Sequence, residues 1–263
     1  MMKNLLIYIH PRKDFGDEEK ITVKIQIDNS LDLGWKRDDM MLVTNFPYEY
    51  NGVKAIEVGD ENYCDFSPYA SKINTILDLF ERGLIEKKHL YWFHDLDAFQ
   101  NEIITEAELG LETAEVALTD RGRMPKWSTG IIFFKSSSKD IFNWIKDIVY
   151  RHKFDEESAV WVLTGHDNFL YDMVPPLVQG YTEKDIPGIS NINERIKKID
   201  MSYNFRMWNI RSTIKIVLKP IRLVHFHPFE AGEVDFFIRG ENKIHTVLVP
   251  ERLIKIFNHH GIK

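Results

Sequence analysis

Residues 89–99, HLYWFHDLDAF, join a strongly hydrophobic segment to two closely spaced acids. The hydrophobic part, His89–Phe93, is predicted to be a buried strand, and Asp95-Leu96-Asp97 follows where that strand ends. In an open α/β sheet, ligands bind beyond the carboxyl ends of the strands. Two carboxylates at such a point can reach a hard divalent cation and the diphosphate it carries, and burying them without a counter-ion is costly. The stretch therefore predicts a metal site, with an acidic turn at a strand end as the simpler alternative.

Other segments are predicted to form further strands. Each is short and apolar, as buried strands are. They are Leu5–Ile9, Met41–Asn45, Lys54–Val58, Glu115–Thr119, Ile131–Lys135 and Arg222–Phe226.

Segments with helical spacing lie between several of these strands. One has an apolar face over residues 69–80 and a stop at Gly83, and another runs over residues 141–149 behind a Ser136–Ser138 cap cluster. A last helix is expected from Pro250 to just before Gly261. The apolar face over residues 69–80 consists of Tyr69, Ile73, Ile76, Leu77 and Phe80. Strands that alternate with helices indicate an α/β sheet with helices packed on its faces.

Residues 21–27 give two conflicting signals. Their apolar side chains alternate with polar ones, which is typical of a strand. Their position between two strands that are expected to be parallel requires a crossover helix instead. We favour the helix.

The composition is that of a folded globular protein. The chain has 263 residues, of which 44% are hydrophobic and 28% charged, so it is long enough to bury a substantial core. The net charge of −6 argues against a global electrostatic grip on nucleic acid. These values exclude disordered and fibrous proteins.

The compartment is inferred from what the sequence lacks. Cys64 is the only cysteine, so no intramolecular disulfide can form, which fits a reducing compartment. No apolar run approaches the roughly 18 residues that span a bilayer. The first residues are predicted to form a buried strand rather than a signal peptide. We therefore expect a soluble, cytoplasmic protein.

With the acid pair as its centre, the sequence resembles the nucleotide-sugar glycosyltransferases of the GT-A fold. Asp95-Leu96-Asp97 matches the DxD motif of that family, in which the second aspartate binds Mn²⁺ or Mg²⁺ and the first contacts the ribose or the ion. Ile9 and His10 end the first strand, where the fold binds the nucleotide base. Lys72 precedes the metal strand, where members often carry a basic residue that pairs with the first aspartate or the diphosphate.

Two later motifs extend the resemblance. The loop Ser128-Thr129-Gly130 resembles the small-residue loop that contacts the donor, with Ser128 where asparagine is frequent. Asp167-Asn168 resembles the Asp-Gln pair of many members. By that resemblance, Asp167 contacts donor-sugar hydroxyls or acts as a general base, and Asn168 contacts the donor. The alternative is that Asp167 caps a helix, and the two roles are compatible.

A late histidine completes the predicted metal site. Met201-Ser202-Tyr203-Asn204-Phe205-Arg206 resembles a "YNF" stretch of related enzymes, and Leu223–Pro228 follows it. A "His-Phe" pair in this region supplies the third metal ligand in glycogenin-like members, which implies His225. By strand alternation His227 lies on the same face and is the rival ligand.

The resemblance implies the fold class and the domain organisation. The expected fold is α/β: a Rossmann-like, mixed but mostly parallel sheet with helices on both faces. It would form a single catalytic domain over residues 1–263, of which residues from about 229 to 263 are a C-terminal appendage packed on it.

The implied function is metal-dependent transfer of a sugar from a nucleotide sugar, with a UDP-sugar as the expected donor, to an acceptor hydroxyl. Asp97 and Asp167 are the catalytic candidates, and Mn²⁺ or Mg²⁺ is the expected cofactor. The acceptor is a glycan or another hydroxyl compound, and a modified nucleic acid stays open, as does the choice between retention and inversion. The alternatives are a non-catalytic nucleotide- or glycan-binding module and a metal-dependent phosphohydrolase.

Overall fold

The computed structural model describes residues 1–120, 127–164, 192–207, 218, 220–226 and 249–262. Within these residues the central sheet has seven strands in the order β10-β8-β9-β6-β1-β2-β5. Neighbouring strands are parallel except in the two pairs that β9 makes. The mixed, mostly parallel α/β sheet is therefore confirmed. Its strands are β1 Met2–Tyr8, β2 Met40–Thr44, β5 Ile56–Glu57, β6 Leu90–His94, β8 Val116–Asp120, β9 Trp127–Lys135 and β10 Ile196–Ile199.

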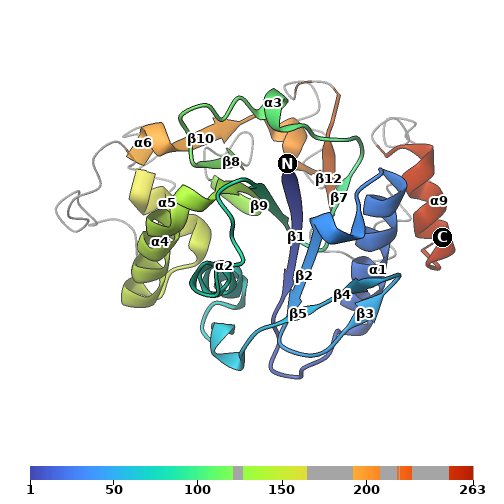
Figure 1. The fold of residues 1–263 in the computed structure, drawn as a ribbon, viewed down its shortest axis with the longest axis horizontal. Coiled ribbons are helices and arrows are strands. Elements are labelled where there is room, and N and C mark those ends of the chain that lie inside the picture. The colour runs from blue at the N-terminus through green and yellow to red at the C-terminus, as the bar shows by residue number, and fades with distance from the viewer. Residues whose placement is uncertain (121–126, 165–191, 208–217, 219, 227–248, 263) are drawn as a thin grey trace.

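Both faces of this sheet are buried. In β6, Tyr91 and Phe93 point to one face and Leu90 and Trp92 to the other, and all four are at most 2% exposed. The helices α2 (Ser71–Glu81), α4 (Lys139–His152) and α5 (Glu156–Thr164) cover the first face. Helix α1 (Asp17–Asp32) covers part of the second (Figure 1).

A small second sheet and the segment 104–114 pack against another part of the second face. The second sheet contains β11 (Phe205–Arg206), β12 (Leu223–His225) and β7 (Ala98–Gln100), in that order. Helix α9 (Glu251–His259) packs against α1 and this sheet through Leu253 and Phe257. The remaining elements are β3 Glu49–Tyr50, β4 Val53–Lys54, α3 Glu106–Leu109 and α6 Ile192–Arg195.

Residues 21–27 form part of helix α1, as we favoured. Ile21 and Ile25 face the second sheet and α9, whereas Val23 and Ile27 face β1 and β2. Each pair is four residues apart, so each lies on one side of the helix. The helix is buried on two sides, and its apolar residues therefore alternate as they would in a strand.

Some local predictions are wrong. Tyr69 is 64% exposed instead of buried, because α2 begins at Ser71 and Tyr69 lies in the 3-10 turn that precedes it. The serines 136–138 form a 3-10 turn whose side chains do not cap α4; the Ser138 hydroxyl donates to the Lys135 carbonyl. The predicted strand Lys54–Val58 is divided between β4 and β5.

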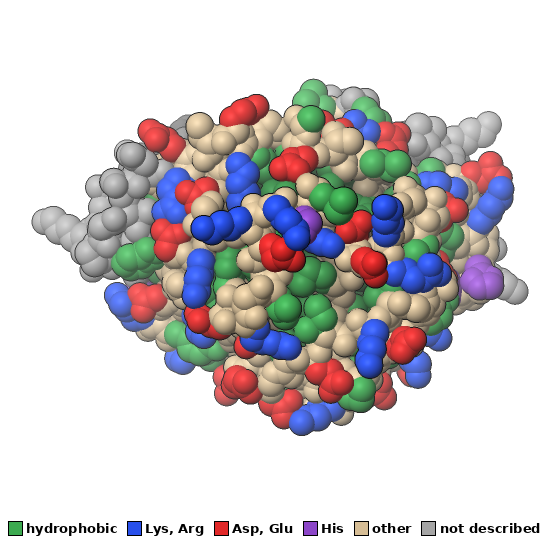
Figure 2. Space-filling view, viewed as in Figure 1, with side chains coloured by type: hydrophobic (Ala, Val, Ile, Leu, Met, Phe, Trp, Pro, Cys, Tyr) green, Lys and Arg blue, Asp and Glu red, His purple; other side chains and the backbone are tan. Residues whose placement is uncertain are grey.

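The last predicted helix is confirmed as α9, and Gly261 beyond it has a positive φ of 84°. Residues 227–248 lie outside the described part, so the C-terminal appendage stays a prediction. No helix in the described ranges combines the length and the apolar character that a bilayer span requires. Positive and negative side chains are interspersed over the face shown in Figure 2.

Arg195, at the end of α6, joins three elements by paired hydrogen bonds. Its guanidinium donates to both carboxylate oxygens of Glu115 at 2.7 and 2.9 Å, and to both of Asp140 at 2.7 Å. Glu115 precedes β8 and Asp140 lies in the first turn of α4. The hydrogen bond from Arg195 lowers the pKa of Asp140 below its usual 3.8.

We predict that Arg195→Gln lowers the free energy of unfolding, because its ion pairs with Glu115 and Asp140 are lost. The loss should be only about 1 kcal/mol, because solvent screens the half-exposed Asp140. Because the folded pKa of Asp140 is depressed, its stabilisation is complete above pH 3.8 and is lost as the pH falls through the folded value. Urea unfolding of the two proteins should therefore differ less below pH 3.8. The control is Arg151→Gln, which removes only an exposed ion pair with Asp147; a pH-independent difference would contradict the assignment.

Candidate active site

Asp95, Asp97 and the residue between them form the turn that joins β6 of the central sheet to β7 of the second sheet. The Asp95 N–H donates to the Gly130 carbonyl at 2.9 Å, which fixes the start of the turn against β9. The Ala98 N–H donates to the Asp95 carbonyl at 3.1 Å and closes it. The acid pair therefore lies at the carboxyl end of a central strand, as predicted.

His225 reaches the acid pair through strand pairing. β12 and β7 are antiparallel, with His225 opposite Ala98, and the Phe226 N–H donates to the Asp97 carbonyl at 2.9 Å. The imidazole is 1% exposed, and its Nε2 lies 3.0 Å from Asp97 Oδ1. One ligand atom from each of Asp95, Asp97 and His225 lies within 4.8 Å of the others.

The polar contacts around His225 fit a bound cation. Asn204 Nδ2 donates to Thr119 Oγ1 and Ser128 Oγ, so the acceptor that faces His225 Nδ1 at 2.8 Å is Asn204 Oδ1. A neutral imidazole then carries its proton on Nδ1 and a lone pair on Nε2. A cation bound beside this lone pair would also be attracted by the Asp97 carboxylate, whose Oδ1 lies 3.0 Å from Nε2. Two carboxylates and an imidazole are suitable ligands for Mn²⁺.

Gly130 leaves room for this arrangement. A Cβ at this position would lie 2.7 Å from His225 Cε1 and 3.0 Å from Asp95 Oδ2. Any larger residue would have to displace one of these two side chains. Gly130 is therefore required by close packing of the histidine and the first aspartate on β9.

Lys72 lies in α2 and pairs with the first aspartate. Its Nζ is 3.3 Å from Asp95 Oδ1 and 3.1 Å from Glu156 Oε1, and it donates to the Thr129 carbonyl at 3.1 Å. Burial lowers the pKa of Lys72, but the negative charges of Asp95 and Glu156 raise it, and the net pKa is above the usual value. Lys72 therefore stays a cation although it is buried.

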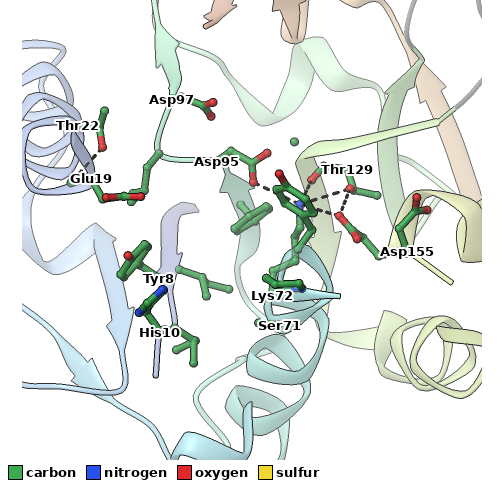
Figure 3. Close-up of a pocket in the computed structure, with 18 of the residues that line it drawn as sticks. Tyr8, His10, Glu19, Thr22, Ser71, Lys72, Asp95, Asp97, Thr129 and Asp155 are labelled. Carbon is green, nitrogen blue, oxygen red and sulfur yellow. Dashed lines mark hydrogen bonds and ion pairs between the residues drawn. The ribbon is translucent and has the colours of Figure 1, made fainter. Parts of the chain in front are cut away.

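Lys72, Asp95 and Asp97 border a pocket of about 630 Å³ (Figure 3). Among the described residues, its charged lining consists of seven carboxylates and two cationic side chains, Lys72 and Arg206. The predicted residues Ile9, His10, Thr129 and Gly130 also line it. The seven carboxylates are Glu18, Glu19, Asp95, Asp97, Asp155, Glu156 and Glu157.

Aromatic rings line the part of the pocket at the end of β1. His10 is stacked against Tyr8 with ring centroids 5.9 Å apart and is edge-on to Tyr63 at 6.2 Å. Burial, together with the neighbouring charge of Arg12, lowers the pKa of His10. The ring is therefore neutral at pH 7 and offers a flat, uncharged surface.

Residues 128–130 belong to strand β9 and not to a loop before it, and Ser128 occupies a different position from the one expected. Its side chain is completely buried and does not line the pocket; its Oγ accepts hydrogen bonds from Asn204 at 2.9 Å and Arg206 at 3.0 Å. Asp167, Asn168 and the rival ligand His227 lie outside the described residues, so their roles stay predictions.

Sequence reasoning missed the acids at the start of α5. Glu156 and Glu157 line the pocket and are 3% and 7% exposed. Thr129 donates to both, from its hydroxyl to Glu156 at 2.8 Å and from its N–H to Glu157 at 3.3 Å. The available signal was the acidic run 155–157 directly before an apolar segment. That run is also typical of an ordinary helix start, where Asp155 indeed caps Ser158 N–H.

Known proteins resemble this chain in fold and not in sequence. No family model matches the sequence, and no curated protein matches it. The galactosyltransferase LgtC, solved with donor and acceptor sugar analogs, aligns over 98% of this chain and 96% of its own at a TM-score of 0.55 and 11% identity. A glycosyltransferase involved in glycosylation of the major capsid of PBCV-1 aligns over 88% and 96% at a TM-score of 0.50 and 12% identity.

The glycosyltransferase GlyE of Streptococcus pneumoniae TIGR4 aligns over 86% of this chain and 55% of its own, at a TM-score of 0.52 and 12% identity. These likenesses confirm the GT-A-like fold class. At such low identity they define the fold alone, and the glycogenin-like subgroup stays a prediction.

We predict that Gly130→Ala weakens Mn²⁺ binding about tenfold or more, because the added methyl group displaces His225 or Asp95. Electron paramagnetic resonance of free Mn²⁺ would measure the dissociation constant. The control is Gly59→Ala, whose Cβ meets only the movable Glu61 carboxylate. Equal affinity in the wild type and Gly130→Ala would show that these side chains do not hold the ion.

Proposed function

We propose that this chain is a metal-dependent glycosyltransferase that moves a sugar from a nucleotide sugar, with a UDP-sugar as the first candidate, to an acceptor hydroxyl. The observation that carries the proposal is the meeting of Asp95, Asp97 and His225 beside a pocket of about 630 Å³. A pocket of this size is in the range of small-molecule and cofactor sites. Its position at the carboxyl ends of the strands is where open α/β sheets bind ligands.

The charge of the pocket supports a requirement for metal. Its carboxylates outnumber its cationic side chains among the described residues, so a diphosphate would be repelled by the side chains alone. Mn²⁺ or Mg²⁺ held by Asp95, Asp97 and His225 would offset the negative charge of the diphosphate as it leaves. Lys72 adds a fixed positive charge from the opposite side of Asp95.

The two ends of the pocket suggest how the donor lies. At the end of β1, the neutral His10 ring and Tyr63 provide flat surfaces against which a nucleobase can stack. At the other end, the carboxylates of Glu156 and Glu157 line the pocket beside Thr129. Carboxylates accept hydrogen bonds, and sugar hydroxyls would supply the donors. We therefore assign the sugar to the end of the pocket near α5.

The role of Asp97 is tested by removing its carboxylate. We predict that Asp97→Ala lowers kcat/KM for sugar transfer about 1,000-fold or more, because several kcal/mol of charge stabilisation are lost with the ion. Transfer from UDP-sugars to a panel of glycan acceptors, with and without EDTA, measures this. The control is Asp78→Ala, in α2 and outside the pocket.

Three outcomes separate the proposal from its rivals. Full activity of Asp97→Ala, or of the wild type in EDTA, would exclude the metal role. A protein whose thermal midpoint rises with UDP and Mn²⁺, but which transfers and hydrolyses no UDP-, GDP- or CMP-sugar, would be a binding module. Hydrolysis of phosphate esters without sugar transfer would favour the phosphohydrolase.

The position of the sugar is tested at Glu156. We predict that Glu156→Gln lowers kcat/KM about tenfold to 100-fold, the size of a charge-assisted hydrogen bond, while the midpoint shift with UDP and Mn²⁺ stays near that of the wild type. The control is the exposed Glu57→Gln. An equal loss of UDP binding and transfer would contradict a sugar contact and indicate that Glu156 acts through its ion pair with Lys72.

A further inference from the structure

Asn204 is the polar partner of the buried histidine on the side away from the aspartates. It is 2% exposed, and its Oδ1 lies 2.8 Å from His225 Nδ1. Its Nδ2 donates to Thr119 Oγ1 at 3.1 Å and to Ser128 Oγ at 2.9 Å. The hydrogen-bonding groups of the Asn204 side chain are thus directed at His225 and at two neighbouring strands of the central sheet, β8 and β9.

These contacts fix the orientation of the amide. If the amide were rotated by 180°, its NH₂ group would face His225 Nδ1 and its oxygen would face the two hydroxyls. In the observed orientation the NH₂ group has two hydroxyl acceptors, and Ser128 Oγ accepts a second hydrogen bond from Arg206 at 3.0 Å. The observed orientation therefore makes Asn204 an acceptor toward the imidazole.

We propose that Asn204 is the positioning residue of His225: it accepts the Nδ1 proton and so directs the Nε2 lone pair at Asp95 and Asp97. The inference rests on the proposed metal site. The inference also assigns Ser128 a role other than contact with the donor sugar. Its hydroxyl accepts a hydrogen bond from Asn204, and its side chain does not line the pocket. An imidazole ring that lacked this acceptor could rotate or protonate Nε2, and either change would remove its lone pair from the site.

Removal of such a partner of a ligating histidine typically costs 10- to 100-fold in metal affinity. We expect Asn204→Ala to weaken Mn²⁺ binding by this factor, measured by electron paramagnetic resonance on the full chain. Asn204→Asp keeps an acceptor toward Nδ1 and should bind Mn²⁺ within about fivefold of the wild type. The matched control is Asn74→Ala, a buried asparagine of α2 whose amide bonds the Asn62 carbonyl and Tyr150, outside the pocket.

A double-mutant cycle separates positioning from a general loss of stability. In a His225→Ala background, Asn204→Ala should have no further effect on Mn²⁺ affinity, because the side chain that it positions is absent. Two results would overturn the positioning role. One is that Asn204→Ala weakens Mn²⁺ binding as much in the His225→Ala background as in the wild type. The other is that Asn204→Ala binds Mn²⁺ like the wild type although His225→Ala binds it more weakly. If neither His225→Ala nor Asp97→Ala weakens Mn²⁺ binding, the metal site itself is wrong.

A measurement on the metal-free wild type keeps the test independent of folding of the variants. Nitrogen-15 spectra of ring-labelled histidine, assigned by His225→Gln, report which nitrogen carries the proton. We expect a proton on Nδ1 of His225. A proton on Nε2 with a bare Nδ1 would overturn the inference.

Discussion

The antiparallel pairing of β7 with β12 is the interaction on which the candidate site depends. It places His225 opposite Ala98, one residue after Asp97, although the two are more than 120 residues apart in the sequence. A shift of this register by one residue would turn the imidazole to the other face of the small sheet. The apolar contacts of Phe99, Val224 and Phe226 with α9 hold that register. The chemistry of the site is therefore anchored in the hydrophobic packing of the second sheet.

The charged groups of the candidate site lie on two sides of Asp95. Lys72 is buried, yet two carboxylates keep its pKa high, so Asp95 always has a cationic neighbour on one side. His225 and Asp97 form the other side, where the imidazole Nε2 lies 3.0 Å from Asp97 Oδ1. Gly130 leaves room for His225 and Asp95 to pack closely beside β9. These ligand types suit a divalent cation, and a bound cation would in turn attract a diphosphate.

Local sequence patterns predicted much of the fold. They were misleading where a helix is buried on two sides and where a residue lies in a turn next to a helix. Residues 21–27 alternate like a strand because α1 packs against two layers, and only the requirement for a crossover favoured the helix. Tyr69 matches the helical spacing of α2 but lies in the preceding turn, where that period does not apply. Periodicity reports which residues are apolar; it does not report how many neighbours an element has.

By itself, the sequence determined the alternation of strands and helices, the α/β class, and an acid pair at the end of a buried strand. These follow from interactions between residues close along the chain. Only the tertiary structure decided that His225 lies beside Asp97, that Asn204 faces the imidazole, and that Glu156 and Glu157 line the pocket. Their positions depend on the register between strands and on the packing of α5 against β9, and such long-range contacts have no periodic signature in a single sequence.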